Sequence, residues 1–276
     1  MAITAAAVNE LRKMTGAGMM DCKKALTETN GDFEAAIDLL RKKGQKISAK
    51  RADRDATEGA VIAKASADNT TGVVVRLSCE TDFVAKNEDF VTLAGQLADI
   101  ALENKPADID ALKALTIDGQ NIGERLTEEM GKIGEKIDVT QYAITEGASV
   151  INYIHAGNRI GVLVELSVGA NNAIVEAGKD VAMQIAAMNP ISVDENDIPE
   201  DVKKRELEIG MEQARAEGKP EQMLEKIAMG KLNKFYKENT LTKQSFVKDS
   251  SKSVEKMLTE INSDLRVVSF ERIALG

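Results

Sequence analysis

An internal repeat is the feature that most constrains how this chain can fold. The tetrapeptide Thr-Glu-Gly-Ala occurs at residues 57–60 and again at residues 145–148. An apolar segment follows each copy, at residues 72–77 and 161–166, and an alanine-rich run of helical character follows each apolar segment. A repeated sequence is the mark of a repeated structural unit. The sequence therefore predicts two homologous subdomains, each built as strand, turn, strand and helix.

The turns within the two copies differ in sequence but share one chemistry. Residues 68–72 read Asp-Asn-Thr-Thr-Gly, and residues 155–158 read His-Ala-Gly-Asn. Asn and Gly are the residues that most readily reverse a chain between antiparallel strands. We therefore expect an α+β fold with antiparallel sheets, with a first subdomain at residues 57–140 and a second at residues 141–276.

Residues 1–44 show three helical patterns separated by turn residues, which predicts a compact three-helix head. Thr4 and Asp32 are placed to cap the first and third helices, and Gly44 is placed to end the third in a left-handed conformation. Residues 45–56 are basic and lack apolar periodicity, so we expect an exposed linker there.

The remaining segments are helical or alternating. Residues 109–136 form a polar stretch with weak helical character. Residues 199–239 favour two charged antiparallel helices joined by a tight turn, as in a protruding coiled-coil hairpin. Residues 254–261 favour a short helix, and the alternation over 266–273 predicts a strand that returns to the second subdomain.

The charge of the chain bears on its partners. Its formal net charge is −9, and such an excess of acid repels phosphate, so general binding of nucleic acid is not expected. No apolar run approaches the roughly 20 residues needed to cross a bilayer, which argues against a membrane span. The first twenty residues lack the apolar core of a secretion signal, so we expect the protein in the cytoplasm.

Little in the sequence points to covalent chemistry. The single histidine, His155, has no neighbour at metal-ligand spacing, and neither Cys22 nor Cys79 has a partner for a metal site. No glycine-rich loop matches a nucleotide-binding motif. An enzyme using a pair of carboxylates is an alternative, but nothing positions such a pair. We expect no enzyme activity, no metal and no cofactor.

Two apolar features could be either core or binding surface. Residues 80–87 have no equivalent in the second copy, and there Phe83 could be an exposed anchor for a partner or could close the core beneath the helix beginning near Phe90. The residues alone leave these two interpretations even. For Met19 and Met20 the default interpretation is core packing.

Three segments, in order, carry a resemblance to a known family. Residues 11–26, with Thr-Gly-Ala-Gly-Met-Met-Asp-Cys at 15–22, residues 81–86 (Thr-Asp-Phe-Val-Ala-Lys) and residues 159–164 (Arg-Ile-Gly-Val-Leu-Val) resemble the bacterial elongation factor Ts family. The resemblance runs over nearly the whole chain. It implies a ubiquitin-associated-like three-helix head, two homologous α+β subdomains and an inserted helical hairpin.

The resemblance implies a guanine-nucleotide exchange factor for the GTPase elongation factor Tu, acting without covalent chemistry. Residues matching the family's contact positions would disturb the partner's magnesium site (Thr81, Asp82, Phe83 and Val84) or bind elsewhere on it (Arg12, Met19, Met20, Ile133 and His155). The resemblance also implies that Met19 and Met20 are exposed, which differs from the core packing that is the default interpretation above. Many members continue beyond the last strand into a helical module, whose contacts are not carried over to this sequence.

Two questions stay open at this point. A ubiquitin-associated-like adaptor that docks a partner through its head, without driving exchange, is the alternative function. A homodimer, or an assembly of two copies with two partner molecules, is an alternative to a single copy. The sequence decides neither question.

Overall fold

The computed structural model describes residues 3–276, which form a mixed α+β structure of helices and antiparallel strands. Contacts divide the chain into two units. The first unit comprises the chain up to Ile62, Val75–Ala143 and Ala274–Gly276, and the second comprises Ala63–Val74 and Ile144–Ile273. Among the described residues, none of the helices combines the length and apolar character needed to cross a membrane.

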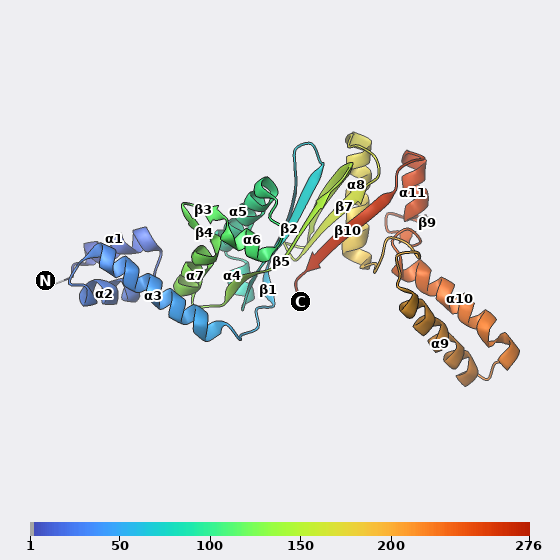
Figure 1. Cartoon of the computed structure of the whole chain (residues 1–276), viewed down its shortest axis with the longest axis horizontal. Helices are drawn as coiled ribbons and strands as arrows, with labels where there is room; N and C mark the ends of the chain where they lie inside the picture. Colours follow the sequence, from blue (N-terminus) through green and yellow to red (C-terminus); the bar gives the residue numbers. More distant parts are fainter. Residues whose placement is uncertain (1–2) are drawn as a thin grey trace. The chain divides into compact units, whose positions relative to one another are not determined.

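The head contains the three predicted helices, α1 (Ala5–Thr15), α2 (Met19–Glu28) and α3 (Phe33–Arg51) (Figure 1). The predicted caps are confirmed: Thr4 Oγ1 accepts the Ala7 N–H at 3.2 Å, and Asp32 Oδ1 accepts the Ala35 N–H at 3.1 Å. Small and aliphatic side chains build the head core. They are Val8, Leu11, Ala17, Cys22, Ala25, Leu26 and Ala36.

The third helix does not end where the sequence predicts. Gly44 lies inside α3, which continues to Arg51, so the predicted stop at Gly44 is wrong and residues 45–51 are helix rather than linker. Gly44 is buried because its backbone packs against Gly131 of α7 (Ile122–Ile133). Because Gly44 has no Cβ, it allows α3 and α7 to cross closely, and it does not form a left-handed helix cap.

The first sheet has the order β1-β2-β5. Its strands are β1 (Glu58–Ala65), β2 (Thr71–Cys79) and β5 (Ile137–Glu146), of which β5 was not predicted. After β2 come α4 (Asp82–Ala85) and α5 (Glu88–Asn104), so the repeat's strand, turn, strand and helix are confirmed here with one added helical turn.

The polar stretch at 109–136 is not one helix. It contains α6 (Ile109–Ala114), a small antiparallel hairpin and then α7. The hairpin pairs β3 (Thr116–Ile117) with β4 (Gln120–Asn121). Its two turn residues, Asp118 and Gly119, both have positive φ, which is the requirement of a tight type I′ hairpin turn. This Asp-Gly signal was missed.

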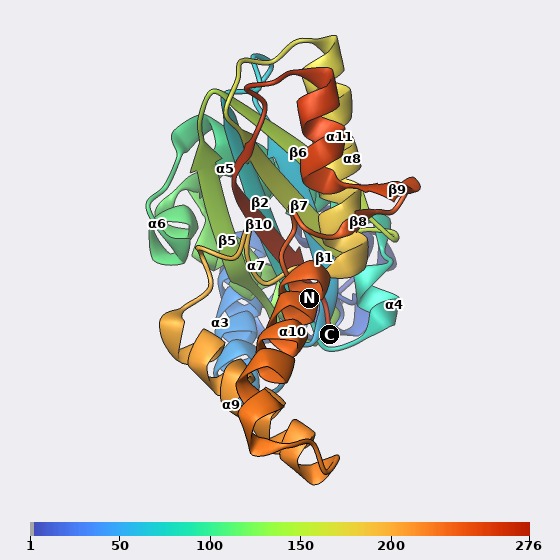
Figure 2. The ribbon, with the colours of Figure 1, turned by 90° about the vertical axis from the view of Figure 1, so that its right-hand side faces the viewer.

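The second sheet has the order β10-β7-β6, with α8 (Asn172–Met188) and α11 (Val254–Ile261) near it (Figure 2). Strand β6 (Ser149–His155) pairs antiparallel with β7 (Ile160–Leu166), and the final strand β10 (Val267–Ala274) joins them as predicted. His155 is the last residue of β6, opposite Ile160, and not part of the turn itself.

The predicted helical hairpin is present as α9 (Glu200–Ala216) and α10 (Glu221–Asn239) (Figure 1). The two helices approach closely where a Cβ on Gly210 would lie 3.2 Å from the Ala228 Cβ. A short pair of strands, β8 (Ser245–Phe246) and β9 (Asp249–Ser253), was not predicted and precedes α11.

Candidate functional site

Helix α4 is a single turn that presents Phe83 to solvent. Thr81 caps it, since Thr81 Oγ1 accepts the Val84 N–H at 3.4 Å. The Phe83 side chain is 83% exposed, whereas Phe90, a residue of α5, is buried. The interpretation that Phe83 closes the core is therefore wrong, and its predicted exposure is confirmed, while its role as a partner anchor stays a prediction. A bare aromatic ring on a soluble surface is a feature of partner-binding sites.

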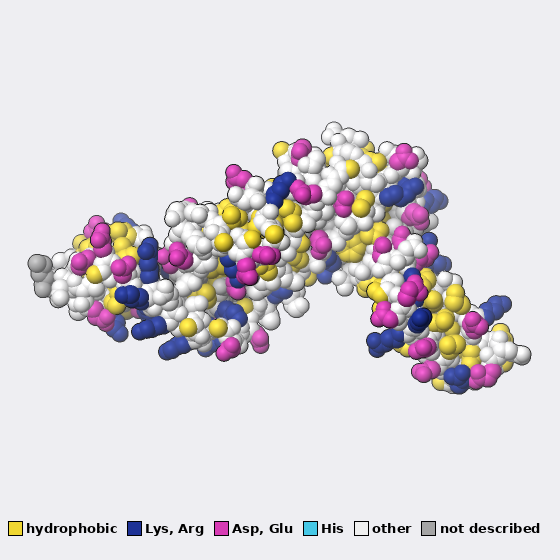
Figure 3. Space-filling model, in the orientation of Figure 1, with side chains coloured by type: hydrophobic (Ala, Val, Ile, Leu, Met, Phe, Trp, Pro, Cys, Tyr) yellow, Lys and Arg dark blue, Asp and Glu magenta, His cyan; other side chains and the backbone are white. Residues whose placement is uncertain are grey.

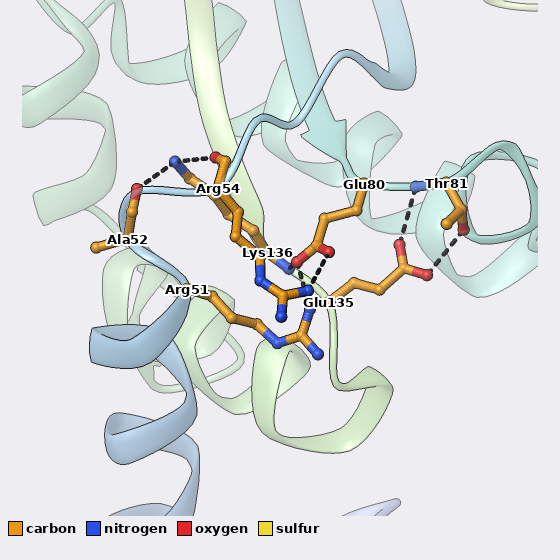
Figure 4. Close-up of polar contacts among 7 residues, drawn as sticks. All are labelled: Arg51, Ala52, Arg54, Glu80, Thr81, Glu135 and Lys136. Carbon is orange, nitrogen blue, oxygen red and sulfur yellow. Dashed lines mark hydrogen bonds and ion pairs between the residues drawn. The ribbon is translucent and has the colours of Figure 1, made fainter.

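The base of α4 is fixed by the turn that follows α7. The Glu135 carboxylate accepts the Thr81 N–H at 3.0 Å and the Thr81 hydroxyl at 2.8 Å (Figure 4). Gly134, with φ of 81°, ends α7 in a left-handed conformation and brings Glu135 toward Thr81. Because a charged acceptor makes the stronger hydrogen bonds, this contact holds the first residue of the turn firmly.

A cluster of charges stands directly behind Thr81. The Glu80 carboxylate accepts hydrogen bonds from the Arg51 and Arg54 guanidinium groups and from the Lys136 N–H (Figure 4). Burial by itself would raise the pKa of Glu80, but these donors outweigh it and lower the pKa to about 2. The Lys136 ammonium in turn donates to the carbonyls of Ala52 and Arg54 at 2.6 and 2.9 Å. Glu80 thus ties the end of α3 to the start of the exposed segment.

Asp82 is paired along its own segment. Lys86 Nζ donates to Asp82 Oδ2 at 2.7 Å, and this hydrogen bond lowers the pKa of Asp82. Beneath the segment, Cys79 Sγ donates to the Thr81 carbonyl at 3.2 Å, and burial raises the pKa of this thiol to about 12. The Asp82 carboxylate is therefore charged and accessible, while Cys79 is a protonated packing residue.

Ile133 lies close to this segment. It is the last residue of α7, is 39% exposed, and precedes Glu135 by two positions. Because Glu135 binds Thr81 directly, the structure brings Ile133 near the start of α4. Thr81, Asp82, Phe83, Val84 and Ile133 therefore belong to one region of the first unit.

The head presents a second apolar surface in the same unit. Met19 and Met20 begin α2 and are 51% and 73% exposed, so the default core interpretation is wrong and the exposure implied by the resemblance is confirmed. Arg12 is exposed on α1. The turn between α1 and α2 lies against α7, because a Cβ on Gly16 would be 3.3 Å from Lys132 Cδ.

His155 belongs to the second unit, whereas the residues named above belong to the first. Its Nδ1 lies 2.9 Å from the Tyr153 hydroxyl, and its ring is half-buried at the end of β6. Residues 3–276 contain no group of three acidic, His or Cys side chains that could hold a metal ion.

The supporting charges were missed by sequence reasoning. Glu135 and Glu80 were not singled out, and Arg51 and Arg54 were interpreted as part of a solvated linker. One signal could have found them, namely that Glu80 is an acidic residue directly before the unrepeated segment while a basic run follows the head. Figure 3 shows the dark-blue Lys and Arg side chains gathered around α3.

Comparison with known proteins gives one consistent result. The family model described as Elongation factor TS matches residues 80–276. Curated proteins named Elongation factor Ts from Amoebophilus asiaticus, Cytophaga hutchinsonii and Christiangramia forsetii are 53%, 54% and 53% identical to this chain. Each alignment covers 99% or more of both chains.

Proposed function

Because the chain belongs to the elongation factor Ts family, we propose that it is the guanine-nucleotide exchange factor that binds elongation factor Tu carrying GDP. Release of GDP then lets GTP bind during translation elongation. The observation that carries this proposal at the level of residues is the exposed Phe83 ring, held on a turn whose base is fixed by Glu135 and Glu80.

The proposed mechanism is displacement at the partner's magnesium site. A GTPase of this class holds Mg²⁺ between the nucleotide phosphates and its own hydroxyl and carboxylate ligands. An inserted Phe83, with the Asp82 charge beside it and Thr81 and Val84 framing it, would shift the groups that support those ligands. Loss of a few such contacts weakens the hold on both the ion and GDP.

We propose that the other named residues bind the partner without touching its magnesium site. Arg12, Met19 and Met20 would contact it through the head, and Ile133 would extend the contact made by α4. His155 would make a separate contact from the second unit.

No catalytic side chain is needed for this role. Exchange obeys thermodynamic linkage, because a factor that weakens GDP binding is itself bound more weakly in the presence of GDP. We accordingly propose a cytoplasmic protein that works without a metal or cofactor of its own and without direct contact to nucleic acid or membrane. The proposed layout has a head of three helices ending in α3, a first α+β subdomain at residues 57–140 and a second at residues 141–276.

The adaptor that docks without driving exchange is the weaker candidate. Whole-length identity of 53% to a named Elongation factor Ts favours the exchange function over a role confined to the head. The head accounts for a small part of the aligned chain.

The test is release of a fluorescent GDP analogue from elongation factor Tu at fixed Mg²⁺ concentration, with and without this protein. We expect the release rate to rise in proportion to added protein until it saturates. Binding of the partner without faster release would instead support the adaptor.

A further inference from the structure

Helix α3 physically connects the head to the exposed segment at Thr81. Its first half belongs to the head, where Ala36 is buried and Ile37 and Leu40 pack against the head core. Its last residue, Arg51, pairs with Glu80, the residue immediately before Thr81. One continuous helix therefore runs from the core of the head to the base of α4.

Between these two ends, α3 crosses α7 at a pair of glycines. A Cβ on Gly131 would lie 2.9 Å from the Gly44 Cα, closer than real Cβ contacts occur. A Cβ on Gly44 would lie 3.1 Å from the Thr127 carbonyl oxygen. Both glycines lie within helices, where alanine is the better helix former, so their use here is the close approach and not backbone freedom.

Contacts on both sides of the crossing fix its angle. Arg41 Nε pairs with Glu128 Oε1 at 3.2 Å on the head side, where the Lys132 side chain also lies against Gly16. On the other side, Lys136 Nζ donates to the carbonyl of Ala52 just beyond α3. The crossing is therefore held along its length rather than at one point.

From this geometry we infer that Gly44 and Gly131 are positioning residues, which set the head so that Met19 and Met20 engage the partner together with Phe83. The inference rests on the proposed function. Two surfaces joined at fixed spacing bind with a high effective concentration for the second contact. A side chain at either glycine pushes α3 away from α7. This changes the distance between the head methionines and Phe83, although both of these surfaces stay intact.

The experiment measures GDP release from elongation factor Tu as a function of factor concentration for Gly131→Ala and Gly44→Ala. We expect the half-saturating concentration to rise about a hundredfold, the lower end of the range lost when a linked second contact fails. The maximal release rate should stay within about a factor of two, because the Glu135 contact that holds Thr81 involves no residue of α3. The matched control is Gly95→Ala, at a helical glycine in α5 with no atom within 4 Å of the new Cβ, which should behave as the parent protein.

A double-mutant cycle separates positioning from simple loss of fold. Met20→Ala should raise the half-saturating concentration in the parent protein but add nothing in the Gly131→Ala background, because the head has already disengaged. Additive effects of the two changes, or unchanged exchange in both glycine variants, would overturn the inference. If Gly131→Ala does not fold, the same cycle on Gly44→Ala, which meets a milder contact, decides the question.

This design keeps the two claims apart. If the parent protein fails to accelerate release, the proposed function fails. A different result would leave the proposed function intact. In that case the parent accelerates release and Met20→Ala raises the half-saturating concentration, but the glycine variants behave as Gly95→Ala does. Only the positioning role of the crossing would then be wrong.

Discussion

Glu135 binds Thr81 at two atoms, accepting its N–H at 3.0 Å and its hydroxyl at 2.8 Å. The two residues are 54 positions apart in the sequence. The direction in which α4 presents Phe83 is therefore fixed by a tertiary contact from the end of α7, and not by α4 alone, which is too short to be stable as an isolated helix.

Glu135→Ala should therefore loosen α4 and slow exchange. Hydrogen bonds to a charged group contribute about 1.5–3 kcal/mol each, and a rise of about 1.5 kcal/mol in the barrier to GDP release lowers the maximal release rate about tenfold. The fluorescence of the bound GDP analogue, followed over time, measures this release rate. The control is Glu103→Ala, at an exposed glutamate near the end of α5, which should leave the rate unchanged. An unaltered rate in Glu135→Ala would show that the hydrogen bonds from Thr81 to Glu135 do not matter for exchange.

The Glu80 cluster predicts a pH dependence of stability. The pKa of Glu80 is lowered from 4.5 to about 2 in the folded protein, so its carboxylate favours the folded state once it is ionised. The stabilisation is fully present above about pH 4.5 and is lost as the pH falls toward 2. Because the folded protein binds this proton more weakly than the unfolded chain does, the free energy of unfolding rises with pH across this range.

Denaturant unfolding of the parent and of Glu80→Gln, at several pH values, measures this contribution. We expect Glu80→Gln to be less stable at pH 7 and the gap to close between pH 4.5 and 2. A gap that stays constant over this range would contradict the assignment of the stabilisation to the Glu80 charge.

The head surface gives a prediction that concerns binding alone. Met20 is 73% exposed, so Met20→Ala should change the free energy of unfolding by less than about 0.5 kcal/mol. We expect the half-saturating concentration for exchange to rise several-fold with little change in the maximal rate. Thermal unfolding provides the control, because a lowered melting temperature would mean that Met20 contributes to packing.

Much of the fold could be predicted because local patterns agree with it. The caps at Thr4 and Asp32, the helical hairpin and the final strand all follow from short-range signals that the tertiary structure does not override. The repeat predicted the strand, turn, strand and helix order in both copies because each copy carries its own apolar pattern.

The errors arise where distant residues decide the outcome. Gly44 has the chemistry of a helix stop, and only its contact with Gly131 shows that it is a crossing point. The residues alone left the exposure of Phe83 even and favoured core packing for Met20, since an apolar side chain in sequence is compatible with core and with surface. Glu80 and Glu135 escaped notice because their partners lie tens of residues away.

The exposed ring of Phe83 makes the central claim directly testable. Phe83→Ala should leave the free energy of unfolding within about 0.5 kcal/mol of the parent, because the ring makes no core contact of consequence. Met223→Ala, which removes a 45% exposed side chain from α10, is the matched control.

The deciding measurement is the rate of GDP release from elongation factor Tu at saturating concentrations of the parent, Phe83→Ala and Met223→Ala proteins. Loss of a buried anchor contact of about 2 kcal/mol predicts a fall of about thirtyfold for Phe83→Ala and no change for Met223→Ala. Release by folded Phe83→Ala protein at the parent rate would contradict the account.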